Sequence, residues 1–501
     1  MASPAGTVSV PRSVSRPVPW PVLLVATAMV GVLLALSGAY GFHRDELYFI
    51  VAGRHPALGY VDQPSLTPLL SAASVALLGL SPTAVRVLPA LAMGLIVILI
   101  ALMAGDLGGS RRAQVLAAVI AALSGYLAAG HADSTATFDF LAWAVVLWLL
   151  VKLLAGGDPR LWLGVGVATG IALENKDTIL FLGVGLVAGF VVCRRWEVFR
   201  SRWAWGALGI AVLLWVPNLA WQAANGWPQL MMAGSISGDA GDNRASLIPE
   251  LLLGAGLLLF PVVGIGWAWL LAAAEARPWR PIGIAGIVTV ALVFLSGGKG
   301  YYAVGIVAPY MAAAGVLVDR WIARGHGLIK GLGFIAMAAM SGALVAYVTL
   351  PILSPAAFAR TTLPATDPVE AEQVGWPELV ATVEGVVDTL PADERDRAMI
   401  LTGNYGEAGA LQLLGTGLPP VFSGHNAYWD WGPPPDDRDV VIRVGEWPAS
   451  FWSSFFDDCT AAATIQNDLG IDNQEEGQHI YVCRGMHEPW ATIWPQFRHL
   501  D

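Results

Sequence analysis

The sequence predicts a mainly α-helical membrane protein, a polytopic transmembrane bundle followed by a smaller α/β domain, and two observations support this fold class. Of the 501 residues, 55% are hydrophobic and only 13% are charged, which is too apolar for a soluble domain of this length. The charge is also unevenly divided. Residues from Ser354 onward include 23 acidic and 7 basic side chains, a net charge of −16, whereas the preceding part carries +6. This contrast indicates two domains.

About eleven apolar segments are long enough to cross a bilayer, which takes about 20 apolar residues, or fewer where the bilayer thins. They cover roughly residues 21–39, 84–105, 113–130, 138–154, 161–174, 178–193, 203–221, 248–273, 281–296, 301–318 and 331–351. The first segment resembles a signal peptide, but no convincing small-residue cleavage site follows it, so we expect a retained helix. Residues 65–80 are also apolar, but Pro64 and Pro68 favour a helix lying along the interface.

The distribution of Lys and Arg near the helix ends orients the bundle. With residues 1–20 as a cytoplasmic tail, the inner loops hold 15 of these residues and the outer loops hold 6. A crossing by residues 65–80 would reverse that bias. The transmembrane domain is then residues 21–352, and residues 353–501 form an extracytoplasmic domain. With 24 arginines against four lysines and abundant Ala and Gly, the composition indicates a bacterium, and we expect a multi-pass protein of its plasma membrane.

Residues 161–193 have basic residues at both ends, so they should cross the membrane an even number of times. Two short helices would satisfy this, with the tetrapeptide Glu-Asn-Lys-Asp, residues 174–177, at the outer tip. Because a helix rises about 1.5 Å per residue, each arm would reach only about 20–25 Å. The charged tip is therefore expected to lie below the outer surface.

The C-terminal part has the pattern of an α/β domain. Short strands are predicted at residues 398–402, 440–444 and 479–482, and helices at residues 378–389 and 407–414. Cys459 and Cys483 both lie in this domain. In an oxidising compartment they can form a disulfide or remain as two thiols, and the sequence leaves both open.

Polar residues gather in five of the predicted outer loops, whereas the helix interiors hold almost no charge. These loops are residues 41–82, 131–139, 174–177, 221–246 and 297–302. In the first of them, residues 40–83 in its full extent, the acidic pair Asp45-Glu46 directly follows a membrane helix, with His55 and Asp62 nearby. Such residues are costly at a membrane boundary unless they serve a site. The structural alternative is a helix start, where carboxylates are also favoured.

Two further carboxylates and two lysines complete the set of candidates. Asp133 and Asp139 lie six residues apart near the start of the fourth span, so on one helix they would lie on different faces. We expect only Asp139 to face the site, because it lies just inside the apolar run, where a charge is costlier. Ser134 or Thr135 can also serve as a helix cap there. Lys176 and Lys299 are the only lysines outside the inner loops. Lysine suits phosphate binding, and the glycines around Lys299 allow close approach to an anion or simply a flexible connection.

Several motifs in this order resemble the family 39-like glycosyltransferases, bacterial membrane relatives of the protein O-mannosyltransferases and of the lipid A aminoarabinose transferase. The motifs are HRDELYF (43–49), AGRHPALGYVDQPSLTP (52–68), PNLAWQAANGWP (217–228), GGKGYY (297–302), APY (308–310), NYGEAGALQLLG (404–415) and GHNAYWDWGPP (424–434). The Lys-bearing tip after the fifth span adds to the likeness. Ser65 departs from the pattern, since relatives often have a second proline there.

The resemblance implies the GT-C fold, a polyprenyl-phosphate-linked sugar as donor and Asp45 as catalytic base in a single displacement that inverts the anomeric centre. Glu46 would orient Asp45, an acceptor or a divalent ion, and Asp139 would be a second carboxylate, with Asp133 as the alternative. Lys176 and Lys299 would bind the donor phosphate. The remaining expected contacts are Tyr301 and Tyr302 to sugar or lipid, and His55 and Asp62 to the acceptor.

The sequence says less about cofactors and partners than about the fold. No cofactor motif is present, whether a P-loop, a dinucleotide fingerprint or a zinc-spaced cluster. A divalent metal, Mg²⁺ or Mn²⁺, stays open, with Asp45, Glu46 and Asp139 as its ligands. The expected partners are the donor lipid, membrane lipids and an envelope acceptor that is a lipid, glycan or protein, and no nucleic acid. A transporter or flippase, or a lipid-binding scaffold, is the alternative, but the repeated halves and midplane charges of a transporter are not visible.

Overall fold

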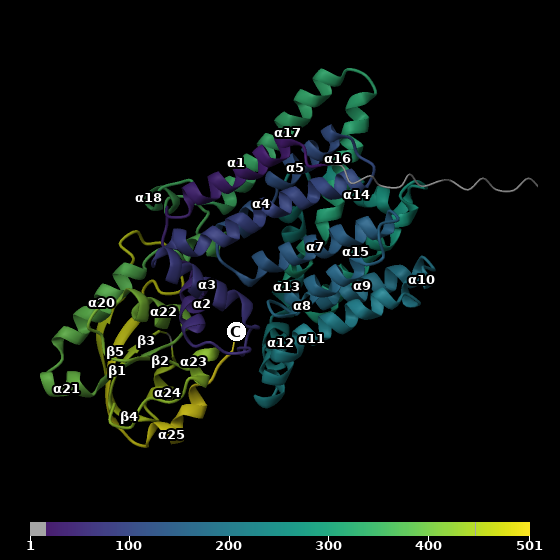
Figure 1. Cartoon of the computed structure of the whole chain (residues 1–501). Helices are drawn as coiled ribbons and strands as arrows, with labels where there is room; N and C mark the ends of the chain where they lie inside the picture. The colour runs from purple at the N-terminus through teal and green to yellow at the C-terminus, as the bar shows by residue number, and fades with distance from the viewer. Residues whose placement is uncertain (1–16, 446, 501) are drawn as a thin grey trace, which may run out of the picture.

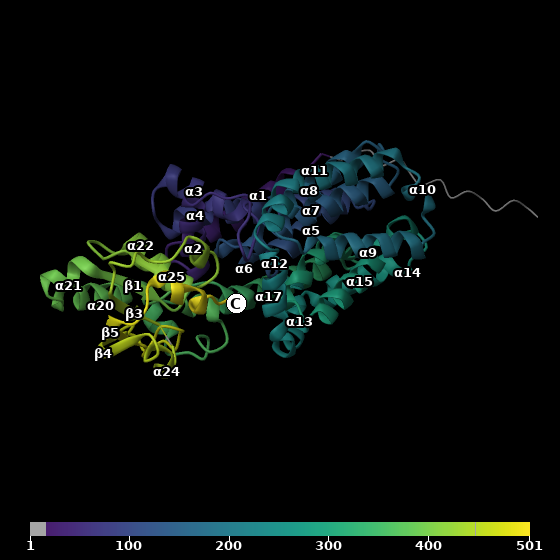
Figure 2. The same ribbon diagram turned by 90° about the horizontal axis from the view of Figure 1, so that it is seen from below.

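The computed structural model describes residues 17–445 and 447–500, and it consists of a long helical bundle with a smaller sheet-containing domain beside one end (Figures 1 and 2). Two short helices, α2 (Arg44–Arg54) and α3 (Leu66–Leu78), lie where the two parts meet. The mainly α fold with a small C-terminal sheet domain is thus confirmed. The expected cytoplasmic tail lies outside the described residues up to residue 16, and α1 begins at Trp20.

Each apolar segment of the sequence is helical in the bundle. The helices are α1 (Trp20–Leu36), α4 (Pro82–Asp106), α5 (Arg111–Ala122), α6 (Tyr126–His131), α7 (Thr135–Leu154), α8 (Leu161–Leu173), α9 (Ile179–Val192), α10 (Trp196–Phe199), α11 (Arg202–Ala224), α12 (Pro228–Gly238), α13 (Ala240–Ala255), α14 (Phe260–Ala272), η1 (Arg277–Trp279), α15 (Arg280–Ser296), η2 (Gly300–Val307), α16 (Ala308–Ala323) and α17 (Gly327–Thr349).

The expected count of eleven spans is not confirmed. By length and composition, six helical segments among the described residues can cross a membrane, or seven if α13 and α14, which are bent by 93° at their junction, count as one span. The other candidates are helical but short. The helices α1, α8 and α9 have 17, 13 and 14 residues, and the segment 113–130 is divided between α5 and α6.

Small residues allow the helices of the 161–193 segment to pack closely. The helix α8 packs against α11, and α9 packs against α15. On α9, Gly185 and Gly189 face the backbone of Ala285 and Pro281, where an added Cβ would lie within 2.7 and 2.2 Å of a carbonyl oxygen. In lipid the hydrophobic effect does not drive helices together, so close packing of this kind stabilises their association. The predicted pair of short helices is therefore present, although each packs mainly on another helix.

The C-terminal domain is built on a five-stranded mixed sheet in the order β2-β1-β3-β5-β4. Its strands are β1 (Ala398–Thr402), β2 (Val421–Ser423), β3 (Val440–Val444), β4 (Phe456–Thr464) and β5 (His479–Met486). Its helices are α18 (Pro355–Phe358), α19 (Pro368–Ala371), α20 (Trp376–Thr389), α21 (Ala392–Arg397), α22 (Tyr405–Leu414), α23 (Ala427–Asp430), α24 (Ala449–Trp452), α25 (Trp490–Ile493) and η3 (Trp494–Phe497). The strand β1 is parallel to β2 and β3, whereas β5 is antiparallel to β3 and β4.

The alternating side chains of β1 and β3 build a core on each face of this sheet. Ile400 and Ile442 face the helices α20 and α22, and Met399 and Val441 face an aromatic cluster on the other side. Cys459 and Cys483 are directly opposite on β4 and β5 and form a disulfide. The strands and helices expected in this domain match β1, β3, β5, α20 and α22.

The C-terminal domain is docked directly on α2. The helix α22 packs against α2, and Gly409 lies so close that an added Cβ would be 2.8 Å from the Cβ of Leu47. The indole of Trp376 donates a hydrogen bond to the carbonyl of Phe42 at 2.8 Å. Phe42, Leu47 and Trp376 also belong to one hydrophobic core. The segment that bears the acidic pair is therefore held between the bundle and the sheet domain.

Candidate active site

Hydrogen bonds join the five polar loops at the end of the bundle nearest the C-terminal domain. The joining contacts are Asp133 N to Glu46 Oε1 (2.9 Å), Leu66 N to Glu174 O (2.9 Å), Lys176 Nζ to Thr135 Oγ1 (3.0 Å), Lys176 Nζ to Tyr301 Oη (3.4 Å) and Gln229 Nε2 to Tyr60 O (3.2 Å). Loops that are far apart in the sequence thus form one polar region. It contains most of the predicted site residues.

Asp45 lies in the first turn of α2, and its side chain is 32% exposed. The hydroxyl of Tyr405, in the C-terminal domain, donates a hydrogen bond to Asp45 Oδ1 at 2.7 Å. His43 Nδ1 lies 3.9 Å from Oδ2, and Arg44 Nε lies 4.0 Å from Oδ1. Burial alone would raise the pKa of Asp45, but His43, Arg44, the Tyr405 hydrogen bond and the charge of Lys299 together hold it below its usual value. Asp45 is therefore an accessible, ionised carboxylate.

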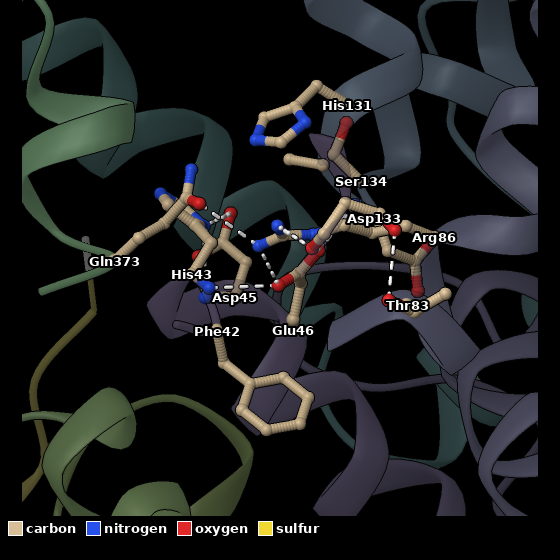
Figure 3. Close-up of polar contacts among 12 residues, drawn as sticks. Phe42, His43, Asp45, Glu46, Thr83, Arg86, His131, Asp133, Ser134 and Gln373 are labelled. Carbon is tan, nitrogen blue, oxygen red and sulfur yellow. Dashed lines mark hydrogen bonds and ion pairs between the residues drawn. The ribbon is translucent and has the colours of Figure 1, made fainter. Parts of the chain in front are cut away.

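Glu46, the next residue, is fully buried and forms a bidentate ion pair with Arg86 (Figure 3). Both nitrogen–oxygen distances are 2.8 Å, and Arg86 is itself almost fully buried at the start of α4. Glu46 also accepts hydrogen bonds from the backbone N–H groups of His43 and Asp133. With each oxygen accepting two donors, this carboxylate organises the local backbone. It completes the capping box that starts α2 and so sets the direction in which Asp45 points.

Arg86 connects this centre to the neighbouring segments. Besides Glu46, its guanidinium donates to the carbonyls of Ser37 and Gly41. It also donates to the side chain of Gln373 (Figure 3). Arginine can satisfy so many acceptors because its guanidinium carries five donors in a planar fork. In the sequence, Arg86 is only one of the six basic residues of the predicted outer loops. The signal that could have found it is its position inside an otherwise apolar predicted span.

The structure places Asp133, rather than Asp139, beside Glu46. Asp133 is buried just before α7, where its Oδ2 accepts a hydrogen bond from the hydroxyl of Ser71. Burial raises the pKa of Asp133 to about 8, and the nearby Glu46 and Asp45 charges add to the effect against the Ser71 hydrogen bond. Asp133 is thus protonated at neutral pH. Ser134, its neighbour, is the N-cap of α7.

Asp139 faces the tip between α8 and α9 instead. Its two oxygens accept hydrogen bonds from Trp143 Nε1 at 3.0 Å and from Thr178 Oγ1 at 2.7 Å. Asp139 is buried, and Thr178 directly precedes α9. This carboxylate therefore fixes the position of the segment that carries Lys176. No hydrogen bond or ion pair joins it to Asp45 in the described part of the chain.

Lys176, Tyr301 and Tyr302 form a second cluster, at the end of the bundle helices. The ammonium of Lys176 lies 4.8 Å from the centre of the Tyr301 ring and 4.6 Å from that of Tyr302. It also donates to Thr135 Oγ1 at 3.0 Å. Within residues 17–445 and 447–500, Lys176 forms no ion pair with a carboxylate. Aromatic rings hold its position while leaving its charge available to an anion.

Lys299 is exposed at the start of the short helix η2, near enough for its charge to influence Asp45. The glycines beside it have separate structural roles. Gly297 has a left-handed backbone with φ of 68°, and Gly300 packs against Leu247 of α13, where an added Cβ would lie at 2.8 Å. Gly300 thus serves helix packing.

His55 and Asp62 have no direct contact with the Asp45 carboxylate in the described chain, although the Asp45 charge contributes to the raised pKa of Asp62. His55 follows the C-terminal end of α2 and stacks on Trp431, with ring centres 4.3 Å apart. Asp62 accepts a hydrogen bond from the hydroxyl of Tyr48 at 2.8 Å, and burial raises the pKa of Asp62 to about 7. His55 thus contacts the C-terminal domain, and Asp62 contacts α2 through Tyr48.

Among the described residues, no group of three or more His, Cys, Asp or Glu side chains is arranged to hold a metal ion. Asp45, Glu46 and Asp139, the expected metal ligands, do not form such a group. Glu46 is occupied by Arg86, and Asp139 is occupied by Trp143 and Thr178. The basic side chains around Asp45 are His43, Arg44 and Lys299, and Glu372 pairs with His43 and Arg44 at 3.0 and 3.3 Å.

The comparison with known proteins supports the fold. Residues 62–221 match the family model described as dolichyl-phosphate-mannose-protein mannosyltransferase. No curated protein sequence matches the chain. The solved structures that match it include ArnT from Cupriavidus metallidurans, bound to undecaprenyl phosphate (TM-score 0.57) and in the apo state (TM-score 0.59). Each is 15% identical, and the match covers 92% of this chain and 97% of that one.

The arabinofuranosyltransferase AftD from Mycobacteria is also similar, with a TM-score of 0.51 and 15% identity. Here the match covers 95% of this chain but 41% of the longer AftD chain. The shared fold therefore extends over the bundle and the C-terminal domain alike. The family match over residues 62–221 agrees with this shared fold.

Proposed function

We propose that this protein moves a sugar from a polyprenyl-phosphate donor to an acceptor hydroxyl, with Asp45 as the general base. The observation that carries the proposal is the contrast within the acidic pair. Asp45 is partly exposed and ionised, as a base must be, whereas Glu46 is sealed by Arg86. The bound undecaprenyl phosphate in the structure of ArnT supports a polyprenyl phosphate as the donor lipid.

In the proposed reaction, Asp45 Oδ2 takes the proton from the acceptor hydroxyl while the oxygen attacks the anomeric carbon of the sugar. The bond between that carbon and the phosphate oxygen breaks, and its electron pair leaves with the lipid phosphate. A phosphate is a good leaving group, so no general acid is required. Attack opposite to the leaving group inverts the anomeric centre.

Lys176 and Lys299 are proposed to bind the donor phosphate and to stabilise the charge that develops on it. Lys176 is held by the rings of Tyr301 and Tyr302 and has no carboxylate partner in the described chain. Lys299 is exposed and close enough to lower the pKa of Asp45. The donor phosphate would therefore lie between the two lysines and the base.

An apolar cavity of about 310 Å³ suits the tail of such a donor. It lies between α7, α8, α9 and α11, and it is lined on α9 by Ile179, Leu182, Leu186 and Phe190. Ile179, which begins α9, follows Lys176 by only three residues. A polyprenyl chain in this cavity would place its phosphate near that lysine.

The direction of the protein in the membrane is also part of the proposal. The excess of Lys and Arg in the opposite loops supports placing the site and the C-terminal domain on the extracytoplasmic face of a bacterial plasma membrane. The disulfide in that domain agrees with an oxidising compartment. The acceptor would then be a component of the cell envelope.

The test uses the purified full chain and a polyprenyl-phosphate-linked sugar, with envelope extract as the source of acceptor. We expect free polyprenyl phosphate to be released on turnover, and we expect Asp45→Asn to release almost none. A transporter or a lipid-binding scaffold would bind the donor without releasing the phosphate. Donor binding with no release by the wild-type protein would contradict the proposed function.

A further inference from the structure

The hydroxyl nearest to Asp45 comes from a residue 360 positions later in the chain. Tyr405 is the first residue of α22 in the C-terminal domain, and its hydroxyl donates to Asp45 Oδ1 at 2.7 Å. The two helices pack side by side with their first turns together, since Gly406 contacts Arg44 and Gly409 contacts Leu47. The site at the end of the bundle is therefore not formed by the bundle alone.

The position of Tyr405 is fixed by its own surroundings. Asn404 and Glu407 form a capping box at the start of α22, and the backbone N–H of Tyr405 donates to His425 Nδ1 at 3.3 Å. The Tyr405 ring packs 4.7 Å from the ring of Tyr48 and 4.6 Å from that of His425. A ring confined in this way can present its hydroxyl in one direction only.

Close packing of the two helices sets the distance between Tyr405 and Asp45. Gly406 and Gly409 bring α22 against α2, because an added Cβ would lie 2.7 Å from the Cβ of Arg44 and 2.8 Å from that of Leu47. The guanidinium of Arg44 also lies over the Tyr405 ring, 5.4 Å from its centre. The docking of the C-terminal domain is thus coupled to the geometry of the carboxylate.

We infer that the C-terminal domain completes the active site, and that Tyr405 is a positioning residue for the Asp45 carboxylate. Its hydrogen bond occupies Oδ1 and orients Oδ2 toward the acceptor hydroxyl. A hydrogen bond to the ionised form of a carboxylate also stabilises that form. The basic groups that act on Asp45 are His43 and Arg44 on its own segment and Lys299 from the bundle. The acidic groups near it are Glu372, which pairs with His43 and Arg44, and Asp62 and Asp133, whose pKa values the Asp45 charge raises. This inference rests on the proposed role of Asp45 as the base.

The test is the pH dependence of sugar transfer in Tyr405→Phe, measured on the full-length protein with a polyprenyl-phosphate-linked sugar. We expect kcat to fall about tenfold, the KM for the donor to stay near the wild-type value, and the acidic limb of kcat/KM to move up by about one pH unit. The matched control is Tyr428→Phe. Tyr428 is buried in the same aromatic cluster, but its hydroxyl donates to Gln412 instead.

The proposed role of Asp45 and the proposed role of Tyr405 can fail separately. If Asp45→Asn transfers sugar as fast as the wild type, the base assignment fails, and the role of Tyr405 fails with it. If Asp45→Asn is inactive but Tyr405→Phe has the wild-type kcat and an unshifted pH profile, the base stands and the inference is overturned.

A second variant covers the case in which Tyr405→Phe does not fold. Gly409→Ala retains Tyr405 but adds a methyl group against Leu47, which should move α22 away from α2. We expect the acidic limb to shift in the same direction as for Tyr405→Phe. Cross-linking shows whether the contact between α2 and α22 is lost in the folded Gly409→Ala protein. If the contact is lost and the pH profile is unshifted, the inference is contradicted.

Discussion

The carboxylate side of the site and the lysine side are built in opposite ways. Glu46 is buried against Arg86, and Asp139 is buried against Trp143 and Thr178, so both carboxyl groups are already engaged. Lys176, in contrast, rests on aromatic rings without a carboxylate partner in the described chain, and Lys299 is exposed. The difference suggests that the lysine side is kept ready for an anion. On the carboxylate side, Asp45 is the exception, since it is accessible.

The largest effect on stability is expected from breaking the pair of Glu46 and Arg86. Glu46→Gln leaves the guanidinium buried without its counter-charge, which should lower the free energy of unfolding by about 3–5 kcal/mol. Thermal unfolding in detergent, followed by tryptophan fluorescence, measures this loss. The double variant Glu46→Gln/Arg86→Gln should lose much less than the two single variants combined. Fully additive losses would show that the pair is not coupled.

On the lysine side, we expect a smaller effect that concerns binding rather than folding. Lys176→Met should raise the Kd for polyprenyl phosphate about tenfold or more, because a charge-assisted contact to the phosphate is lost. Equilibrium binding to the purified protein measures it. Lys152→Met is the matched control, since Lys152 also lies on an aromatic ring, 5.0 Å from the centre of Trp148. Lys152 is in the last turn of α7, whereas Lys176 lies beside Thr135 at the start of that helix. Equal losses for both variants would argue against a phosphate site at Lys176.

The remaining effect is a pH dependence of stability that depends on Asp133. Its pKa is raised to about 8, above the ordinary value near 4, so the folded state binds the proton more tightly than the unfolded state. The stability that this proton contributes is fully present below about pH 4 and is lost as the pH rises to about 8. Asp133→Asn should therefore gain in melting temperature relative to the wild type between pH 5 and 8, and level off above that. Asp437→Asn, at an exposed position, should show no such change.

Much of the fold could be predicted from the sequence because it is encoded locally. The apolar segments became helices, and the β-branched run at residues 440–444 became β3. The number of spans could not be predicted in the same way. Whether residues 113–130 form one helix or two depends on the packing of Gly125 against Leu253 of α13, a tertiary contact that no local pattern reveals.

The candidate site could also be predicted only in part. Charge and position were enough to single out Asp45, Glu46 and Lys176. Their different environments were not visible, because Arg86 lies 40 residues from Glu46 and Tyr405 lies 360 residues from Asp45. Similarly, the preference for Asp139 over Asp133 rested on its depth in the apolar run. The structure instead places Asp133 next to Glu46, through a backbone hydrogen bond at 2.9 Å.

The most direct test of the central claim is the single-turnover rate of sugar transfer in Asp45→Asn at saturating donor. With Asp45 as the base, the rate should fall by about 10²–10⁴-fold, while donor affinity and melting temperature remain close to the wild-type values. A transfer rate within about threefold of the wild type, in a folded protein that still binds the donor, would contradict the account.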